Sequence, residues 1–333
     1  MRHNLSVLAL VAAQAAGIAG PALAAPAGEF VVAVHQEPQD LAAQGAYKEI
    51  NAPGLRNVLE TLIATDPVSG EYVPILATAW ERVDEKTVRL TLREGVQFHD
   101  GTEMTAEAAA RAISFIWSPD SAFTIQEYAG PGVMSAKAIG PLEIEVTSTE
   151  PDPMLEFRLT LTGISSAKQI EESPASHFSH PIGTGPYVFD EWVRGQYWTA
   201  SANPDWWGLS AEDAYGETTR QFETLRFVFR PEGSARNAMV RTGEAHLATN
   251  PSPEDCDAAE GNDGYSCVTG PSDAYLYGRL DQSLHAHPAL EDMRVRKAIF
   301  HALDYEGIAD LIGLASVPQG QLGTPDMLGF DED

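Results

Sequence analysis

Cysteine is scarce in this chain, and basic residues are few relative to acidic ones. The 333 residues include only two cysteines, and 21 lysines and arginines stand against 48 aspartates and glutamates, a formal net charge of −27. So large an acidic excess repels phosphate backbones and anionic lipid headgroups, which argues against nucleic-acid and membrane-surface partners. The chain also has no Cys-x-x-Cys, His-Glu-x-x-His or Gly-x-Ser-x-Gly motif. The usual sequence evidence for zinc sites and hydrolases is therefore missing.

Long apolar runs are also lacking, apart from one at the N-terminus. An apolar run over residues 5–19 follows Arg2, and residues 22–24 then read Ala-Leu-Ala. The run is shorter than the roughly 20 residues of a spanning helix. Small residues lie at the two positions that a signal peptidase reads. The pattern predicts a secretory signal peptide over residues 1–24, cleaved after Ala24, and a periplasmic mature protein. An uncleaved membrane anchor is the alternative.

The two cysteines, Cys256 and Cys267, both lie in the exported part of the chain. In an oxidising compartment a disulfide between them is plausible. Sequence alone does not bring their Cα atoms within bonding reach, so a pair of free thiols stays the alternative.

Several stretches have the hydrophobic pattern of β-strands. Residues 30–34 form an unbroken apolar run, which is typical of a strand covered on both faces. Residues 87–93, 142–146 and 225–229 alternate apolar with polar side chains. This period of two predicts three half-buried strands.

Amphipathic helices are expected between these strands. Thr105 can cap a helix that continues to Ile116, and a second helix over residues 234–240 ends at Gly243. A third opens near Asp292 and is expected to direct its apolar face inward, with Val295, Ala298, Ile299, Ala302 and Leu303. The interleaving of strands and helices predicts an α/β architecture. In such folds a binding crevice lies at the carboxyl ends of the strands.

Three stretches, taken together, resemble a known family. Residues 76–101 read as a short Leu-Ala-x-x-Trp helix at 76–80, an alternating strand and an Arg-x-Gly-Val-x-Phe-x-Asp-Gly turn. Residues 183–187 read Gly-Thr-Gly-Pro-Tyr and are followed by Asn-Pro-Asp-Trp-Trp-Gly at 203–208. Residues 292–304 begin Asp-Met-Arg-Val-Arg-Lys-Ala and end Ala-Leu-Asp. In this order and spacing the stretches are similar to the bacterial extracellular solute-binding proteins of family 5, the periplasmic components of ABC importers for peptides and nickel.

These motifs are expected to build a scaffold. Residues 100–101 suit a tight turn in which the glycine takes a positive φ. Gly183 and Gly185 are expected to let the backbone turn sharply. Trp206 and Trp207 are expected to pack in the core or between lobes, since large aromatic side chains are more often buried there than used as ligand platforms.

The resemblance implies an α/β, two-lobed fold of the periplasmic binding protein type (type II), with an inserted subdomain and an incomplete second lobe. Its expected parts are a signal peptide (1–24), a discontinuous lobe I (25–55 and 180–275), an inserted α/β subdomain (56–179) and the start of lobe II (276–333). Residues 318–330 look like the Pro/Gly-rich stretch that precedes further elements in the family. The resemblance therefore implies a chain truncated at its C-terminus.

The same resemblance suggests ligand-binding residues. Glu37 and Gln39 match a segment that runs beside the ligand after the first strand. Tyr275 and Tyr277 match the crossover between lobes, where an aromatic ring often packs on the ligand, and Tyr128 lies in the inserted subdomain. For each of them an ordinary loop or core residue is the alternative.

The function implied is capture of a small solute, most simply a peptide, and its delivery to ABC permease subunits in the inner membrane. No catalytic residue, cofactor or bound metal is expected, and the protein is expected to be a monomer. A truncated chain that binds nothing is one alternative.

Two further alternatives depend on particular residues. A metal or metal-chelate binding protein of the nickel type would use His177-x-x-His180, although Pro174 and Pro181 indicate a loop there. An exported hydrolase would have to be assembled from scattered polar residues, namely His35, Glu37, Asp40, His99 and Asp100.

Overall fold

The computed structural model describes residues 28–42, 52–66, 69–118, 134–209, 221–262, 264–268, 280, 287–313 and 318. The predicted signal peptide lies outside these residues. Within them, no helix has both the length and the apolar character needed to span a bilayer.

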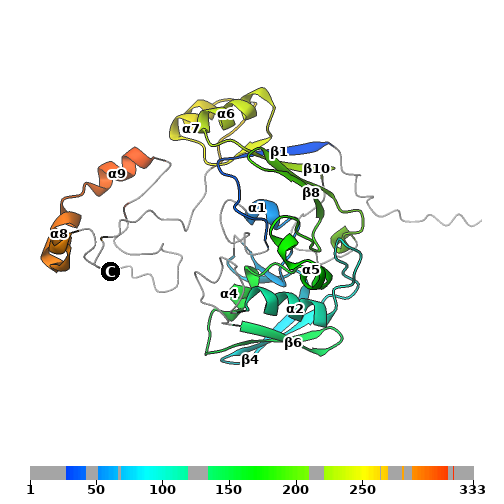
Figure 1. Ribbon diagram of the computed structural model, residues 1–333. Coiled ribbons are helices and arrows are strands. Elements are labelled where there is room, and N and C mark those ends of the chain that lie inside the picture. The colour runs from blue at the N-terminus through cyan, green and yellow to red at the C-terminus, as the bar shows by residue number, and fades with distance from the viewer. Residues whose placement is uncertain are drawn as a thin grey trace, which may run out of the picture.

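A five-stranded sheet forms the upper part of the molecule in Figure 1. Its strands, in spatial order, are β11 (Leu247–Ala248), β1 (Glu29–Val34), β10 (Thr224–Phe229), β9 (Tyr197–Ala202) and β8 (Tyr187–Val193). The strand predicted at residues 30–34 is confirmed as β1, which pairs in parallel with both β10 and β11. The pairings of β10 with β9 and of β9 with β8 are antiparallel.

Each face of this sheet is covered by different residues. On the outer face, Val31 and Ala33 pack with Val228 and with Met239 of α6 (Gly233–Thr242). On the inner face, β1 contributes Val32 and Val34 to the large core cluster. Helix α7 (Pro253–Ala259) lies beside α6 above the sheet (Figure 1), and α1 (Ala52–Leu55) lies below it. The burial of β1 on both faces explains its unbroken apolar run.

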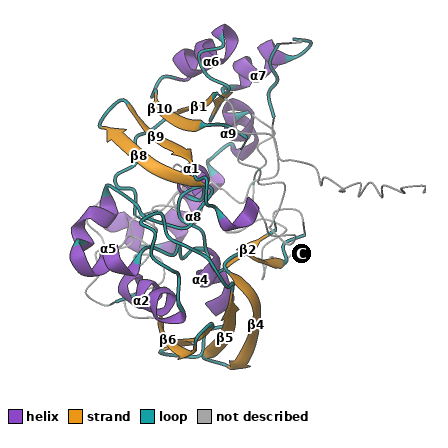
Figure 2. Cartoon of the chain, turned by 90° about the vertical axis from the view of Figure 1, so that its right-hand side faces the viewer, coloured by secondary structure: helices purple, strands orange, loops and turns teal. Residues whose placement is uncertain are grey.

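The lower part of the molecule contains a four-stranded antiparallel sheet, visible at the bottom of Figure 2. Its order is β4 (Ala77–Asp84), β5 (Thr87–Leu92), β7 (Glu143–Ser148) and β6 (Met134–Gly140). The other elements of this part are α2 (Ala106–Ile116), α4 (Leu155–Thr160), α5 (Ala167–Glu172), the 3₁₀ helix η2 (Pro174–Phe178) and the pair β2 (Ile63–Thr65) and β3 (Tyr72–Pro74). Helix α2 packs against β6 and β7. Val88, Leu90 and Leu92 are buried, as their alternation predicts.

The helix expected at residues 76–80 is wrong: these residues enter strand β4. β4 pairs antiparallel with β5, with Trp80 opposite Leu90, and a bulge lies between Ala77 and Ala79. Pairing with the next strand through a short turn at Glu85 and Lys86 outweighs the helix propensity of the alanines, which is only a weak local preference.

Two helix ends in the described part of the chain follow the predicted caps. The Thr105 side chain accepts a hydrogen bond from the Ala108 amide and caps α2. Gly243 ends α6 with φ 77° in the left-handed region. Both predictions are confirmed, because each depends on local chemistry alone.

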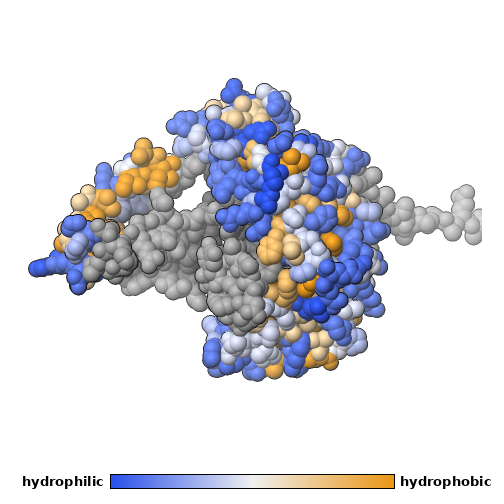
Figure 3. Space-filling view, in the orientation of Figure 1, coloured by the Kyte–Doolittle hydropathy of each residue, from blue (hydrophilic) through white to orange (hydrophobic). Residues whose placement is uncertain are grey.

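The inward apolar face predicted near Asp292 is contradicted. Helix α8 (Met293–His301) follows the short 3₁₀ helix η4 (Pro288–Glu291), and none of its residues is buried. The next helix, α9 (Tyr305–Ile312), buries only Ala309. Ile299, Leu303 and Leu311 are exposed, and hydrophobic colour is prominent over α9 in Figure 3. The helical period was correct, but periodicity does not state what a helix packs against.

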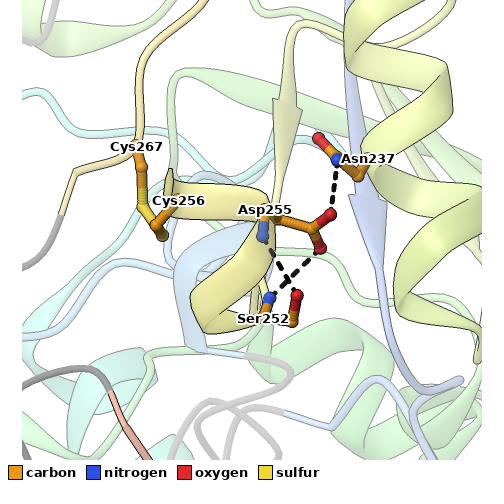
Figure 4. The surroundings of a disulfide bond; sticks show 5 residues. All are labelled: Asn237, Ser252, Asp255, Cys256 and Cys267. Carbon is orange, nitrogen blue, oxygen red and sulfur yellow. Dashed lines mark hydrogen bonds between the residues drawn. A yellow bond between two sulfur atoms is a disulfide. The ribbon is translucent and has the colours of Figure 1, made fainter. Parts of the chain in front are cut away.

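A disulfide joins Cys256, on α7, to Cys267 (Figure 4). The start of α7 is fixed by a capping box, in which Ser252 and Asp255 exchange backbone-to-side-chain hydrogen bonds. Asp255 also accepts a hydrogen bond from Asn237 on α6. Of the two alternatives left open by the sequence, the structure therefore has the disulfide.

Candidate functional site

The carboxyl ends of β1, β10 and β11 meet at one edge of the upper sheet. Val34 pairs with Phe229, and Ala33 pairs with Ala248. One residue further on, the Arg230 amide donates to the Val34 carbonyl and the Thr249 amide donates to the Ala33 carbonyl. Three parallel strands thus end side by side, which is where α/β proteins form ligand crevices.

A cavity of about 400 Å³ lies against the inner face of the sheet and extends from this edge, at His35 and Thr249, to the amino ends of β1 and β10, at Phe30 and Phe222. Its apolar lining comes mainly from the strands: Phe30, Val32, Val34, Phe222, Leu225, Phe227 and Leu247. Its polar lining among the described residues consists of His35, Asn57, Tyr187, Gln221, Thr249 and Asn250. A mostly apolar wall with a few polar groups is typical of a small-molecule site.

Two polar atoms of this lining are buried without a hydrogen-bond partner in the described part of the chain. They are His35 Nδ1, just after β1, and Thr249 Oγ1, just after β11. A buried polar atom left unsatisfied costs about 1–3 kcal/mol, so most proteins avoid it. Other buried atoms, such as Ser165 Oγ and Trp192 Nε1, also lack a partner in the described chain, but these two share one cavity, where a ligand could supply their partners.

The predicted ligand residues Glu37 and Gln39 both contact Arg194, in the hairpin between β8 and β9. The Glu37 carboxylate is 3.8 Å from the Arg194 guanidinium, and the same guanidinium donates to the Gln39 carbonyl. Arg194 stacks over the Trp192 ring at the tip of the β8–β9 hairpin. Neither Glu37 nor Gln39 is among the described residues that line the cavity. Tyr128, Tyr275 and Tyr277 lie outside the described residues.

The backbone around the cavity is held by the Gly-Thr-Gly motif. Neither Gly183 nor Gly185 has a positive φ, so the sharp turn expected there is not the reason for glycine. A Cβ on Gly183 would overlap the Val58 carbonyl oxygen, and a Cβ on Gly185 would overlap that of Asn57. The glycines therefore allow two backbone segments to approach closely. The Gly185 amide donates to the Val58 carbonyl across this approach.

His99 and Asp100, from the turn motif, hold the same segment from the other side. The His99 amide donates to the Gly183 carbonyl, and the His99 ring Nε2 lies 3.0 Å from the Gly185 carbonyl oxygen. Asp100 accepts a hydrogen bond from Ser166 Oγ at 2.5 Å. Gly101 takes a φ of 79°, as the predicted turn requires.

Sequence reasoning missed the most deeply buried carboxylate of this region, Glu60. Its Oε1 accepts from Trp206 Nε1 at 3.0 Å, and its Oε2 accepts from Trp207 Nε1 at 2.8 Å and from Thr184 Oγ1 at 2.7 Å. Burial raises the pKa of Glu60 to about 7, although these three donors and Arg93 act to lower it. Glu60 ties two of the family motifs together. A lone glutamate in the apolar run of residues 58–63 was the available signal.

The residues that support the rival interpretations have other roles in the structure. His177 is fully buried against Phe115 and Phe178, whereas the exposed His180 contacts Phe189. The two histidines therefore do not present one common surface. In the described ranges no cluster of three or more His, Cys, Asp or Glu side chains is arranged to hold a metal ion.

Known proteins of one family are similar to this chain. The family model for bacterial extracellular solute-binding proteins, family 5 (Middle), matches residues 71–333. The dipeptide-binding protein of Escherichia coli (strain K12) is 24% identical over 321 residues, which cover 89% of this chain and 57% of that protein.

Solved structures of periplasmic binding proteins have a similar fold. The dipeptide-binding protein of Pseudoalteromonas sp. SM9913, in complex with Met-Leu, superimposes with a TM-score of 0.69 at 20% identity, over 85% of this chain and 58% of that one. NikZ of Campylobacter jejuni, in complex with Ni(L-His), superimposes with a TM-score of 0.70 at 20% identity, over 86% and 55%. The chain thus spans a little over half the length of each of these proteins. The predicted α/β, periplasmic-binding-protein-like fold is confirmed, whereas the lobe boundaries stay predictions.

Proposed function

The chain belongs to the bacterial extracellular solute-binding proteins of family 5, and from this premise we propose that it captures a small solute, most simply a peptide, at the carboxyl edge of β1, β10 and β11. The observation that carries this proposal is the pair of buried, unpartnered polar atoms, His35 Nδ1 and Thr249 Oγ1, in one cavity.

A peptide matches the chemistry of this cavity. Its backbone alternates hydrogen-bond donors and acceptors, and its side chains include apolar groups. The Thr249 hydroxyl both donates and accepts, and the Asn57 and Asn250 amides do the same. The apolar wall formed by Val32, Val34 and Phe227 suits a hydrophobic ligand side chain.

The polar lining supports binding without chemical change to the ligand. Among the described residues that line the cavity there is no carboxylate and no cysteine. Paired carboxylates and activated thiols are two of the common catalytic arrangements in hydrolases. His99 and Asp100, which the hydrolase interpretation needs, are occupied with Gly185 and Ser166. The chain is therefore proposed to be a binding protein and not an enzyme.

Export and delivery complete the proposal. The signal peptide over residues 1–24 would send the chain to the periplasm, and the Cys256–Cys267 disulfide suits that oxidising compartment. Closure of two lobes around the solute would present the complex to the permease subunits of an inner-membrane ABC importer. The lobes would be residues 25–55 with 180–275, and residues 276 onward, acting in a monomer.

The ligand residues expected from the sequence would lie around this cavity. Glu37 and Gln39 would form its rim beside Arg194, where the Glu37 carboxylate favours a cationic group of the ligand. Tyr128, Tyr275 and Tyr277 would contribute rings from segments outside the described residues.

Calorimetric titration with the dipeptide Met-Leu and with Ni(L-His) tests the function. We expect saturable one-to-one binding of Met-Leu. The variant His35→Ala should weaken that binding about tenfold, the effect of losing one buried hydrogen bond to the ligand. His180→Ala is the matched control, because this exposed ring lies outside the described lining of the cavity.

Three results would count against the proposal in different ways. Saturable binding of Ni(L-His) without Met-Leu would replace the peptide by a metal chelate. Equal affinities of the two histidine variants would remove His35 from the site. Release of free methionine and leucine from Met-Leu would show hydrolysis and overturn the binding-protein assignment.

A further inference from the structure

One buried arginine contacts both loops at the edge of the cavity. Arg236, on α6, is 4% exposed. Its Nη1 donates to the carbonyls of Arg230 and Pro231, at 2.7 Å each. Its Nε donates to the Thr249 carbonyl and its Nη2 to the Asn250 carbonyl, at 3.0 Å each. All four acceptors are backbone oxygens.

These four oxygens come from two separate segments. Residues 230–231 directly follow β10, and residues 249–250 directly follow β11. Strand β1 lies between those two strands. A single planar side chain therefore fixes the loops on both sides of β1, at the end of the sheet where Thr249 and Asn250 line the cavity.

The backbone at Asn250 needs such support. Asn250 has a φ of 53°, and it is the one non-glycine residue of the described chain with a positive φ. Asparagine tolerates the left-handed region better than most residues, but glycine adopts it more easily. Backbone strain of this kind persists where neighbouring contacts enforce it and is concentrated at ligand sites. The bond from Arg236 to the Asn250 carbonyl is one such contact.

We propose that Arg236 is a positioning residue for ligand binding: it holds the Thr249–Asn250 segment so that the two side chains meet the ligand, without touching the ligand itself. The inference depends on the proposed function, because it assigns Arg236 a role at that same cavity. It goes further in making affinity depend on a guanidinium buried behind the cavity wall.

Arginine suits this position and lysine does not. The guanidinium has five N–H donors in a rigid plane, so it reaches carbonyls on two segments at once. A lysine ammonium keeps the charge but donates from a single point at the end of a flexible chain. The variant Arg236→Lys therefore keeps the charge and shortens the reach, and it isolates the geometry of the clamp. Arg241→Lys, at an exposed position on the same helix, is the matched control.

Two measurements on the full chain separate positioning from general stabilisation. In Arg236→Lys, amide hydrogen exchange at Arg230 and Thr249 should rise about tenfold or more, while amides of β5 and α2 keep their rates. Affinity for Met-Leu should fall about tenfold or more in the same variant. Exchange that rises uniformly across the chain, with unchanged affinity, would make Arg236 a purely structural residue and overturn the inference.

A second pair of variants tests the segment without altering Arg236. Asn250→Gly and Asn250→Ala both remove the side-chain amide, but only glycine adopts a φ of 53° without strain. We expect the glycine variant to bind Met-Leu more tightly than the alanine variant. Equal affinities would show that the backbone of this segment is irrelevant to binding. If the unmodified chain binds no Met-Leu, the proposed function fails and this inference fails with it. If it binds and Arg236→Lys binds equally well, only the inference is wrong.

Discussion

Two groups of buried polar side chains, around Glu60 and at the cavity, differ in how well their hydrogen bonds are satisfied. Glu60 is enclosed by three donors, from Thr184, Trp206 and Trp207. At the cavity, His35 Nδ1 and Thr249 Oγ1 are buried but without a partner in the described chain. Satisfied polar networks make one structure rigid, whereas an unsatisfied polar atom retains its capacity to bind something else. The two cavity atoms are therefore available to a ligand, whereas the Glu60 carboxylate is already engaged by protein donors.

The largest effect is expected for a substitution in the scaffold, at Gly185. Gly185→Ala should lower the free energy of unfolding by more than about 4 kcal/mol, or prevent folding, because the new Cβ would overlap the Asn57 carbonyl. Gly195→Ala is the control: this glycine has a φ of 72° and open space around it. Only backbone strain remains there, so its cost should be about 1 kcal/mol. Urea unfolding of both variants measures the contrast, and equal losses would contradict close packing at Gly185.

The next largest effect is expected at Glu60. Glu60→Ala removes the acceptor of three buried donors and should cost about 3 kcal/mol of unfolding free energy, measured by urea unfolding at pH 6. Glu71→Ala, an exposed glutamate of the same part of the chain, is the control and should change stability by less than about 0.5 kcal/mol. A cost at Glu60 as small as that of the control would mean that the carboxylate is not needed to join the two motifs.

Stability should also depend on pH through Glu60. Burial raises its folded-state pKa from the ordinary 4.5 to about 7. Between these values the folded state binds the proton more tightly than the unfolded state does, so the contribution of Glu60 to stability is largest below pH 4.5 and falls as the pH rises toward 7. The loss attributable to Glu60 should be at most about 3 kcal/mol. Glu60→Gln should show a flatter dependence over this range than the unmodified chain. An unchanged slope would assign the pH dependence to other groups.

The Cys256–Cys267 disulfide provides a further stability test that does not involve either group of polar side chains. Replacing both Cys256 and Cys267 by serine should lower the free energy of unfolding by about 2–3 kcal/mol, the range expected for so short a closed loop. Because α7 follows the Thr249–Asn250 segment directly, exchange should increase around α7 more than in the lower sheet. Thermal unfolding with and without reductant checks the result. A variant as stable as the parent would show that the crosslink constrains nothing.

Sequence reasoning predicted the elements better than their partners. The apolar run of β1 and the alternation in β5 have strand periods that are independent of distant residues. The same reasoning placed a helix at residues 76–80, where pairing with β5 produces a strand. It also directed the apolar face of α8 inward, although Ile299 is exposed. Local patterns determine the period of an element, and only the tertiary structure determines what covers it.

The candidate site was predicted only in outline. The rule that α/β crevices lie at the carboxyl ends of strands pointed to the edge of the sheet where His35 and Thr249 line the cavity. Glu37 was expected to line the crevice. In the structure it pairs with Arg194 and is not among the described residues that line the cavity. Thr249 and Arg236 carry no sequence signal of their own. Their roles arise from the parallel pairing of β1 with β10 and β11, which joins residues about 200 positions apart in the chain.

The most direct test of the central claim is the variant Thr249→Val, studied for stability and binding together. Valine has nearly the shape of threonine but no hydroxyl. Because Thr249 Oγ1 has no partner in the described chain, its loss should leave the free energy of unfolding unchanged or raise it by up to about 1 kcal/mol. Affinity for Met-Leu should nevertheless fall about tenfold. A variant that loses stability and keeps its affinity would show that the hydroxyl belongs to the scaffold, and the distinction between the two polar groups would be wrong.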